Sequence, residues 1–341
     1  MGDPELETLA EIAGRLGVST ATVSRVLNGD PAVADATREK ILKEINDSGF
    51  RKRQRRRSTA LHNEKTAMII AAQLQNPITL GFVDGIRRRL TEAGIRSVIA
   101  LSDFDSGAEC DALSYALGSG FSGIFMLNAI ENQRLVGLVS RAKQPVIFVN
   151  RFLRTLDTDV VTVDNYRCGY MATSYLIGYG HRRVAHIAGP ATSMTCRERT
   201  RGYIDAMKDA GLDVSSGFIY TGDRSYRCGL EFGEKICSMP RSERFTAVFS
   251  TTGLMAAGMV DRLRSCGIGV PEDISVICND DYSRDYIPCP MDFNTYAQDP
   301  IVMGQTAAEL MLERLQNREA PPRRVIFSPV LTERNSVRRL I

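Results

Sequence analysis

Long apolar runs, paired cysteines and clustered histidines are all missing from this 341-residue sequence. No apolar stretch comes near the roughly 20 residues that a membrane-spanning helix needs, and the acidic start MGDPELETL contains no apolar signal segment. The eight cysteines include no C-x-x-C pair and the three histidines are scattered, so we expect reduced thiols and no metal site. The sequence predicts a cytoplasmic protein that has no membrane partner and no cofactor.

Signatures of catalysis are missing as well, because the chain contains no G-x-S-x-G elbow and no Walker loop. We therefore expect no enzyme. A G-x-G-x-x-G string at residues 118–123 follows a helix-like stretch and precedes the strand-like IFML, which is the reverse of the dinucleotide-binding order. We interpret it as a helix-to-strand turn. Three acidic residues after a later strand lack calcium-loop spacing and are interpreted as a solvated loop: Asp280, Asp281 and Asp285.

Charge is concentrated locally. The formal net charge is only +3, and 24% of the residues are charged, as in ordinary globular proteins of two or three domains. Residues 51–57 nevertheless read RKRQRRR, with six cations in seven positions. Such a run fits a nucleic-acid contact, a nuclear-type address or a solvated linker.

An alternating pattern fills the chain from Thr66 onward. An apolar strand-like run, a loop, an amphipathic helix and a glycine recur, and Gly94, Gly211 and Gly267 stand where a helix end needs a left-handed residue. Strand–helix alternation predicts parallel sheets covered by helices on both faces. Because about 270 residues exceed one ordinary domain, we expect two similar α/β lobes with a ligand-binding cleft between them.

A compact helical head is predicted before residue 50. Residues 8–16 open with a capping box at Thr8, and Ser19 can cap a second helix after a tight turn at Gly17. A third helix is expected at about 35–48, with three apolar residues: Ile41, Leu42 and Ile45. This order of helices and turns is the helix-turn-helix arrangement.

The second helix of the head has five residues outside its apolar stripe, among them three hydroxyl-bearing residues and one arginine. These residues are Thr20, Ala21, Thr22, Ser24 and Arg25. Hydroxyl groups suit phosphate contacts and an arginine can reach a guanine edge. The pattern favours DNA binding, although a three-helix protein-contact module would look similar.

The segment LAEIAGRLGVSTATVSRVLNG followed by VADATREKI closely resembles the LacI/GalR family of bacterial transcription regulators. NPITLGFVDGI, VDN, GHRRVAHIAGP and GVPEDISVI match later family motifs in the expected order. The resemblance implies an α/β protein with a three-helix helix-turn-helix head and a two-lobed, periplasmic-binding-protein-like core with parallel sheets. The implied domains are the head at 6–50, a basic hinge at 51–65, an N-terminal lobe at 66–163 with 292–325, and a C-terminal lobe at 164–291 with 326–341.

The resemblance also implies a function. A homodimer would read a near-palindromic operator in double-stranded DNA and act as a repressor under the control of a small effector. By position, Thr20, Ala21 and Arg25 fall on base-reading positions. The other implied DNA-binding residues are Thr8, Thr22, Ser24, Asn28 and Thr37, with Arg53, Arg57 and Leu61 in the hinge. Ala34 replaces a serine that usually caps the third helix, which costs about 1 kcal/mol unless Asp35 substitutes for it.

The hinge departs from the family pattern, in which a leucine from each subunit wedges into the minor groove. Strict counting places Thr59 at the wedge position, while Leu61 lies two residues later. Either a shifted wedge at Leu61 kinks the DNA, or the arginines track phosphates without a wedge. A nuclear address does not suit a chain of this bacterial type.

The cleft departs from the family as well. The resemblance implies nine effector-binding residues: Ile78, Thr79, Asn150, Asp164, Ser193, Thr195, Arg199, Arg224 and Thr252. Arg199 is the implied ligand clamp and Asp164 the implied lobe-crossing acid. However, the family's Asn-Asp pair is Thr252-Gly253 here, and Asn150 replaces a frequent aspartate.

A cleft that loses two carboxylates and gains Arg224 should prefer an acidic sugar-like effector, such as a sugar acid or phosphosugar. Alternatively, Arg224 faces solvent and the cleft has lost effector binding. A solute-binding protein of the periplasmic type would share the two lobes, but it would carry an export signal and no helix-turn-helix.

Overall fold

The computed structural model describes residues 9–27, 33–47, 65–215, 218–280 and 291–340. The chain divides into two compact units, residues 1–62 and residues 63–341, which are described separately. Within the described ranges, no helix is both long enough and apolar enough to cross a membrane. The same ranges contain no cluster of side chains that could hold a metal ion.

The first unit is a three-helix head. Its helices are α1 (Leu9–Leu16), α2 (Thr20–Leu27) and α3 (Asp35–Asp47). Ile12, Val23 and Ile41 are almost fully buried where the three helices meet. Leu42, which is also apolar, is 46% exposed. A helix turns by about 100° per residue, so Ile41 and Ile45 share the buried face and Leu42 does not.

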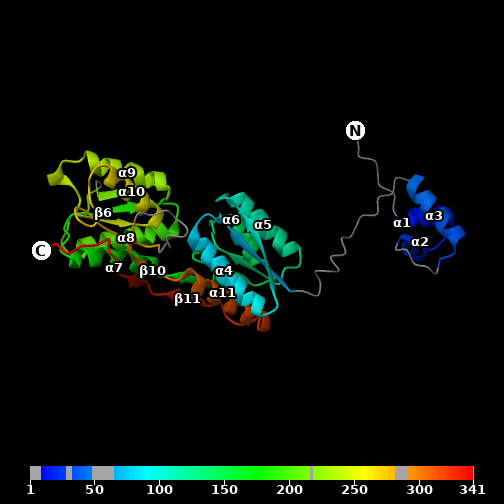
Figure 1. The fold of residues 1–341 in the computed structure, drawn as a ribbon. Helices are drawn as coiled ribbons and strands as arrows, with labels where there is room; N and C mark the ends of the chain where they lie inside the picture. The colour runs from blue at the N-terminus through cyan, green and yellow to red at the C-terminus, as the bar shows by residue number, and fades with distance from the viewer. Residues whose placement is uncertain (1–8, 28–32, 48–64, 216–217, 281–290, 341) are drawn as a thin grey trace. The chain divides into compact units, whose positions relative to one another are not determined.

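The second unit contains two lobes, each built on one six-stranded sheet (Figure 1). The N-terminal lobe has the strand order β11-β5-β4-β3-β1-β2, and every pair in it is parallel. Its strands are β1 (Thr66–Ala71), β2 (Arg96–Leu101), β3 (Gly123–Met126), β4 (Val146–Val149), β5 (Asp159–Val163) and β11 (Arg324–Phe327). Its helices are α4 (Pro77–Glu92), α5 (Ser106–Gly118), α6 (Gln133–Ser140) and α11 (Pro300–Gln316).

Alternate residues of each strand bury opposite faces of the N-terminal sheet. In β1, Ile69 packs with α4 and α11, whereas Ile70 packs with α5 and α6. This alternation is the period of two that a strand imposes on its side chains. Both faces of the sheet are therefore covered, as predicted for a parallel sheet.

The C-terminal lobe repeats this architecture in the order β12-β10-β9-β8-β6-β7, with only β12 antiparallel to its neighbour. Its strands are β6 (Val184–Ala188), β7 (Ile219–Thr221), β8 (Ala247–Ser250), β9 (Ser275–Cys278), β10 (Asn294–Ala297) and β12 (Val330–Thr332). Its helices are α7 (Asn165–Gly178), α8 (Met194–Asp209), α9 (Tyr226–Ser238) and α10 (Gly253–Ser265), with the short η2 (Arg241–Glu243). Helices α9 and α10 cover one face of the sheet, and α7 and α8 cover the other (Figure 1).

The local turn predictions are confirmed. Gly94, Gly211 and Gly267 follow their helices with φ values of 70°, 67° and 73°, in the left-handed region that glycine adopts without steric cost. The string at 118–123 joins the end of α5 to the start of β3. It is a helix-to-strand turn and not a phosphate-binding loop.

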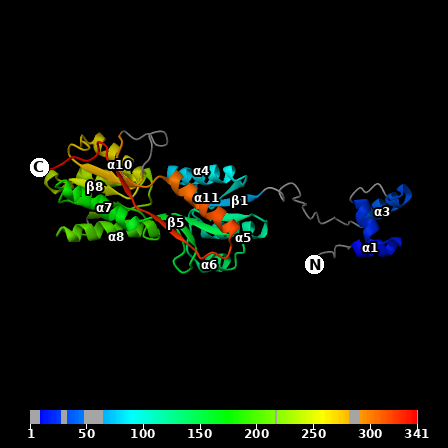
Figure 2. The ribbon, with the colours of Figure 1, turned by 90° about the horizontal axis from the view of Figure 1, so that it is seen from below.

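The chain passes from one lobe to the other three times, and Figure 2 shows the red C-terminal segment extending along both lobes. The passages lie between β5 and α7, between β10 and α11, and between β11 and β12. The boundaries expected at 292 and 326 were therefore wrong. Residues 294–297 pair with β9 in the C-terminal lobe, and residues 324–327 pair with β5 in the N-terminal lobe. Partner choice between two similar sheets is a tertiary property, which the local pattern of these short strands does not encode.

Candidate functional site

One side of α2 in the head is open to solvent. Thr20, Ala21 and Arg25 are exposed there, while Val23 is buried. Thr22 already has a partner within the head. Its backbone N–H donates to Ser19 Oγ at 3.1 Å, and its hydroxyl lies 2.8 Å from the same atom. Ser19 thus caps α2 as predicted, and the short exposed residues beside Arg25 leave room for a close approach to DNA.

Several predicted DNA contacts are not described. The positions of Thr8, Asn28, Arg53, Arg57 and Leu61, and the side chain of Ser24, lie outside the described residues. Thr37 is half-buried in the first turn of α3.

The start of α3 compensates only partly for its missing serine. The Ala34 carbonyl accepts from the backbone N–H groups of Thr37 and Arg38, so it stands at the position before the helix. Asp35 lies in the first turn, where its charge favours the helix dipole, and it is 3.9 Å from Arg38. A favourable charge is present without the side-chain cap that serine provides.

A cavity of about 340 Å³, here called the cleft cavity, opens between the two lobes of the core. Four of its lining residues follow the carboxyl ends of parallel strands: Asn150 follows β4, Arg224 follows β7, Thr252 follows β8 and Asp280 follows β9. Ligands bind in such crevices in open α/β sheets. The volume falls within the range of about 300–1,000 Å³ that is typical of small-molecule sites.

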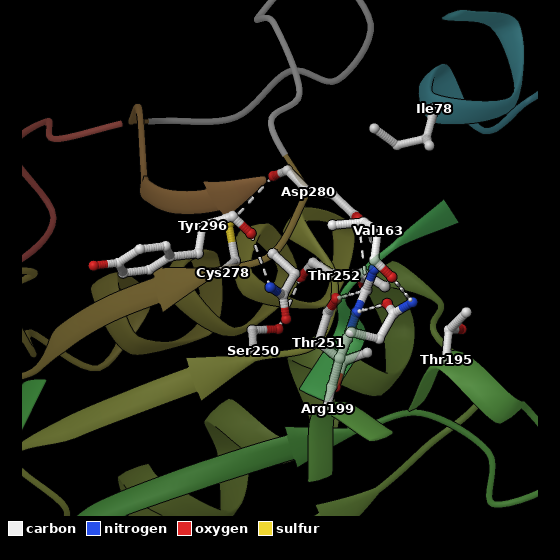
Figure 3. A network of polar contacts seen from close by, with 12 residues as sticks. Ile78, Val163, Thr195, Arg199, Ser250, Thr251, Thr252, Cys278, Asp280 and Tyr296 are labelled. Carbon is white, nitrogen blue, oxygen red and sulfur yellow. Dashed lines mark hydrogen bonds and ion pairs between the residues drawn. The ribbon is translucent and has the colours of Figure 1, made fainter. Parts of the chain in front are cut away.

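Arg199 is fixed in the C-terminal lobe by hydrogen bonds and an ion pair (Figure 3). Its Nε donates to Asn165 Oδ1 at 2.9 Å, and its Nη1 donates to the Thr251 carbonyl at 2.9 Å. Nη1 is also 3.7 Å from Asp280 Oδ1, and both side chains of this pair are about nine-tenths buried. The guanidinium is therefore pre-oriented in the wall of the cleft, as a ligand clamp needs to be.

Seven of the nine predicted effector positions line the cleft cavity or an adjoining one. Ile78, Asn150, Thr195, Arg199, Arg224 and Thr252 line the cleft cavity. Ser193 lines the adjoining cavity of about 580 Å³, which also lies between the lobes. Figure 3 shows Ile78 on α4, apart from the network around Arg199.

Thr79 and Asp164 line neither cavity. Thr79 follows Ile78 on α4 and is rotated away from it by the helix. Asp164 caps α7, because its Oδ1 accepts from the Arg167 N–H at 2.9 Å. Its role in the structure is therefore to begin the helix after the first passage between the lobes.

One expectation about charge in the cleft was wrong, and one of the two alternatives for Arg224 is favoured. Asp280 is not part of a solvated loop, because its side chain is 12% exposed and pairs with Arg199; Asp281 and Asp285 lie outside the described residues. Arg224 does not simply face solvent, since it lines both cavities and its guanidinium lies 5.1 Å from the Phe104 ring centroid. This cation–π contact joins the two lobes.

Sequence reasoning also missed Arg151, Phe104 and Asp223, which line the cleft cavity. Arg151 directly follows Asn150 after β4, and Asp280 follows β9 by two residues. The rule that ligands bind at the carboxyl ends of parallel strands would have selected both positions. Both positions could therefore be predicted from the order of strands and loops in the sequence.

Left-handed backbone conformations are concentrated at the cleft. Among the described residues, four that are not glycine have positive φ, and three of them, Phe104, Asn150 and Arg224, line the cleft cavity with φ values of 61°, 70° and 72°. Such conformations cost about 1–3 kcal/mol each and gather at functional sites. This concentration supports the cleft as the ligand site.

The positive charge of Arg151 is poorly compensated by acidic side chains. Burial, followed by the charge of Arg224, lowers its pKa to about 10. Neither Arg151 nor Arg224 forms an ion pair with any carboxylate in the described part of the chain. Glu109 attracts Arg151, but burial raises the pKa of that carboxyl to about 7, so it carries only part of a charge at neutral pH.

A helix-turn-helix head in the same chain as a two-lobed core with a cavity between the lobes defines the class of ligand-responsive DNA-binding regulators. Comparison with known families agrees with this class. The family model of bacterial regulatory proteins, lacI family, matches residues 8–52, and that of the periplasmic binding protein-like domain matches residues 173–337. The chain belongs to the lacI family of bacterial regulatory proteins and is a DNA-binding transcription regulator.

Individual relatives align over almost the whole chain. The transcriptional regulator CelR of Thermobifida fusca is 30% identical over 98% of both chains, and the transcriptional repressor PurR of Photobacterium profundum is 28% identical over 98% of this chain and all of its own. A solved CelR–cellobiose complex has a TM-score of 0.71 at 29% identity and covers 97% of this chain and 99% of that one. The lac repressor dimer bound to operator has a TM-score of 0.72 at 21% identity, covers 98% and 100%, and shares the fold.

Proposed function

We propose that this regulator is a cytoplasmic, dimeric repressor that binds a near-palindromic operator and releases or tightens it in response to a small, sugar-like effector. The observation that carries this proposal is the pre-oriented Arg199 in a ligand-sized cavity between two lobes. The head contributes the DNA-reading surface of Thr20, Ala21 and Arg25. The solved complex of the relative CelR with cellobiose supports a sugar-like ligand. The arginines that line the cleft favour sugar acids and phosphosugars among such ligands.

The edge of the N-terminal sheet supports dimerisation. In β2, which is an edge strand, Val98, Ile99 and Leu101 are 44%, 40% and 48% exposed, and Tyr115 of α5 is 63% exposed. Exposed apolar side chains on an edge strand are a liability unless a partner covers them. A symmetric second subunit covers such a surface and also presents two heads to the two halves of an operator.

Control of DNA binding follows from linkage between the two units. An effector that binds one arrangement of the lobes more tightly shifts the population toward that arrangement and changes operator affinity. Coupling of this kind is typically about 1–3 kcal/mol, which is about 5- to 150-fold in affinity. Thr252 and Asp280 belong to the C-terminal lobe and Ile78 and Asn150 to the N-terminal lobe, so one ligand can contact both.

The first test is to select operator fragments from genomic DNA with the purified protein and to measure their affinity by fluorescence anisotropy. We expect an inverted-repeat site, binding that weakens steeply with salt, and a loss of about tenfold or more for Arg25→Ala. Arg182→Ala, at an exposed arginine of the core, is the matched control and should bind like the parent protein. Salt-independent binding without sequence preference would contradict the proposal.

The hinge is tested separately. Leu61→Ala should reduce DNA bending if Leu61 inserts into the minor groove, and unchanged bending and affinity would reject the shifted wedge. Arg53→Ala and Arg57→Ala should each lower the salt dependence by about one phosphate contact if the basic run tracks the DNA backbone. Fluorescence anisotropy at several salt concentrations measures the salt dependence of operator affinity, and gel-based assays measure DNA bending.

A further inference from the structure

Cations outnumber acids around the two connected cavities. Among the described lining residues, five arginines stand against three acids, Glu131, Asp223 and Asp280. All three acids have partners: Asp280 pairs with Arg199, and Asp223 Oδ1 accepts from the Ser225 N–H at 2.9 Å. Glu131 accepts from the Thr155 N–H and hydroxyl.

Arg151 and Arg224 form the wall shared by both cavities, and they come from opposite lobes. Arg224 reaches the N-terminal lobe through its contact with Phe104, which brings it near Arg151. Each guanidinium repels the other, so this wall favours separation of the lobes when no anion is present. An anion placed between them would reverse the sign of that interaction.

The start of α8 adds to the positive potential of the adjoining cavity. Thr192, Ser193 and Met194 line that cavity, and Ser193 makes no side-chain cap bond to the helix. Its hydroxyl is 3.0 Å from the Thr195 hydroxyl instead. Uncapped N–H groups at a helix start attract anions, which supports the same ligand chemistry as the arginines.

We propose that the effector is a small organic anion whose carboxylate or phosphate group is held between Arg151 of the N-terminal lobe and Arg224 of the C-terminal lobe. Neutralisation of both arginines by this group draws the lobes together. The hydroxyl groups of the same ligand face Arg199, Asp280 and Asn150. This inference rests on the proposed function, since it names the ligand class of the same cleft and the force that closes it.

The test uses the full chain and inorganic phosphate as the simplest probe. Thermal unfolding is followed in sodium phosphate and in sodium chloride at equal ionic strength. We expect phosphate to raise the melting temperature of the parent protein and of the Arg182→Gln control, but not of Arg151→Gln or Arg224→Gln. An equal effect of phosphate and chloride, or an undiminished response of both cleft variants, would overturn the proposal.

A second measurement separates binding from a structural role. In chloride buffer, Arg151→Gln should be at least as stable as the parent protein, because it removes a buried and repelled cation. Arg151→Lys and Arg224→Lys keep the charge and should retain a smaller phosphate response, since they lose the planar fork. Loss of the response in the lysine variants to the same extent as in the glutamine variants would contradict a charge-based site.

Calorimetry with glucose, glucuronate and glucose 6-phosphate distinguishes a carboxylate from a phosphate source. We expect one acid to bind at least about tenfold more tightly than glucose, and Arg151→Gln to abolish that preference. Equal affinity for glucose and both acids would overturn the anion site. If an acid binds through the arginines but leaves operator affinity unchanged, the proposed regulation fails and the anion site stands. If a neutral sugar alters operator affinity while phosphate has no effect on the melting temperature, the anion site fails and the proposed regulation stands.

Discussion

At the scale of single residues, Glu109 is an acid placed where charge is costly. It is fully buried, its Oε2 accepts from the Ile130 N–H at 2.9 Å, and its Oε1 has no hydrogen-bond partner among the described residues. Burial raises its pKa to about 7 from an ordinary value of 4.5, against the opposing effects of the Ile130 hydrogen bond and the Arg151 charge. The folded protein therefore holds this proton more tightly than the unfolded chain does.

The sign of the pH effect follows from that difference. The contribution of Glu109 to stability is fully present below pH 4.5 and is lost as the pH rises through about 7. We expect Glu109→Gln to gain stability relative to the parent protein between pH 4 and pH 8, by on the order of 3 kcal/mol. Urea unfolding at several pH values measures this, and a constant difference between the two proteins would show that Glu109 does not titrate in this window.

His186 should change the stability of the protein with pH in the direction opposite to that of Glu109. It stacks between Phe249 and Tyr203, and burial lowers its pKa to about 4 from 6.5. Its contribution is fully present above pH 6.5 and is lost as the pH falls toward 4. His186→Gln should therefore be less stable than the parent protein at pH 7.5, and the deficit should shrink by about 2–3 kcal/mol at pH 4.5. Chemical unfolding at the two pH values checks this, and a deficit that grows with acidity would be the contrary result.

Individual site residues could be predicted from their family positions, even where the residue itself differs from the family, as at Thr252. Arg199, Thr252 and Ile78 line the cleft as the resemblance implies. The position of Arg151 after β4 could be predicted from the strand order, but its poor charge compensation could not, because the surrounding charges come from both lobes. Asp280 illustrates the same limit, since only the folded chain brings Arg199 within 3.7 Å of it.

At the scale of elements, glycines let pairs of helices cross at close range. A Cβ on Gly85 of α4 would lie 2.1 Å from the Ile301 carbonyl oxygen of α11, and one on Gly169 of α7 would lie 2.0 Å from the Arg199 carbonyl oxygen of α8. In the third pair, a Cβ on Gly258 of α10 would lie 2.0 Å from the Tyr226 carbonyl oxygen of α9. All three contacts are with backbone atoms, which cannot rotate away.

We expect Gly258→Ala to lower the free energy of unfolding by about 1–3 kcal/mol, because α9 and α10 must separate to admit the methyl group. Gly178→Ala is the matched control, since nothing lies within 4 Å of a Cβ at this last residue of α7. Alanine there should be neutral or should stabilise by up to about 1 kcal/mol. Urea midpoints report both changes, and equal midpoints for the two variants would refute the close-packing explanation.

The sequence predicts most elements because their signals are local. The helix-ending glycines, the turn at 118–123 and the cap at Ser19 each act within a few residues. The lobe boundaries depend instead on which strand pairs with which. Such choices are settled by tertiary packing, so local patterns misplaced them.

At the scale of the whole molecule, the DNA-reading residues and the ligand cavity lie in two separate units, the head and the core. Thermodynamic linkage nevertheless ties the two binding events together. If an effector changes operator affinity by some factor, operator must change effector affinity by the same factor. This equality holds whichever sign the effect has, so it applies to an inducer and to a corepressor alike.

We therefore predict equal factors from two independent titrations. Operator affinity is measured by anisotropy with and without saturating effector, and effector affinity is measured by calorimetry with and without saturating operator. We expect both ratios to fall between about 5 and 150. Arg199→Gln should bring both ratios to about one, because it removes the clamp that holds the effector. Operator affinity without effector should stay unchanged, because Arg199 lies in the core. Ratios that differ beyond error would mean that another equilibrium, such as dissociation of the dimer, is coupled to one of the ligands.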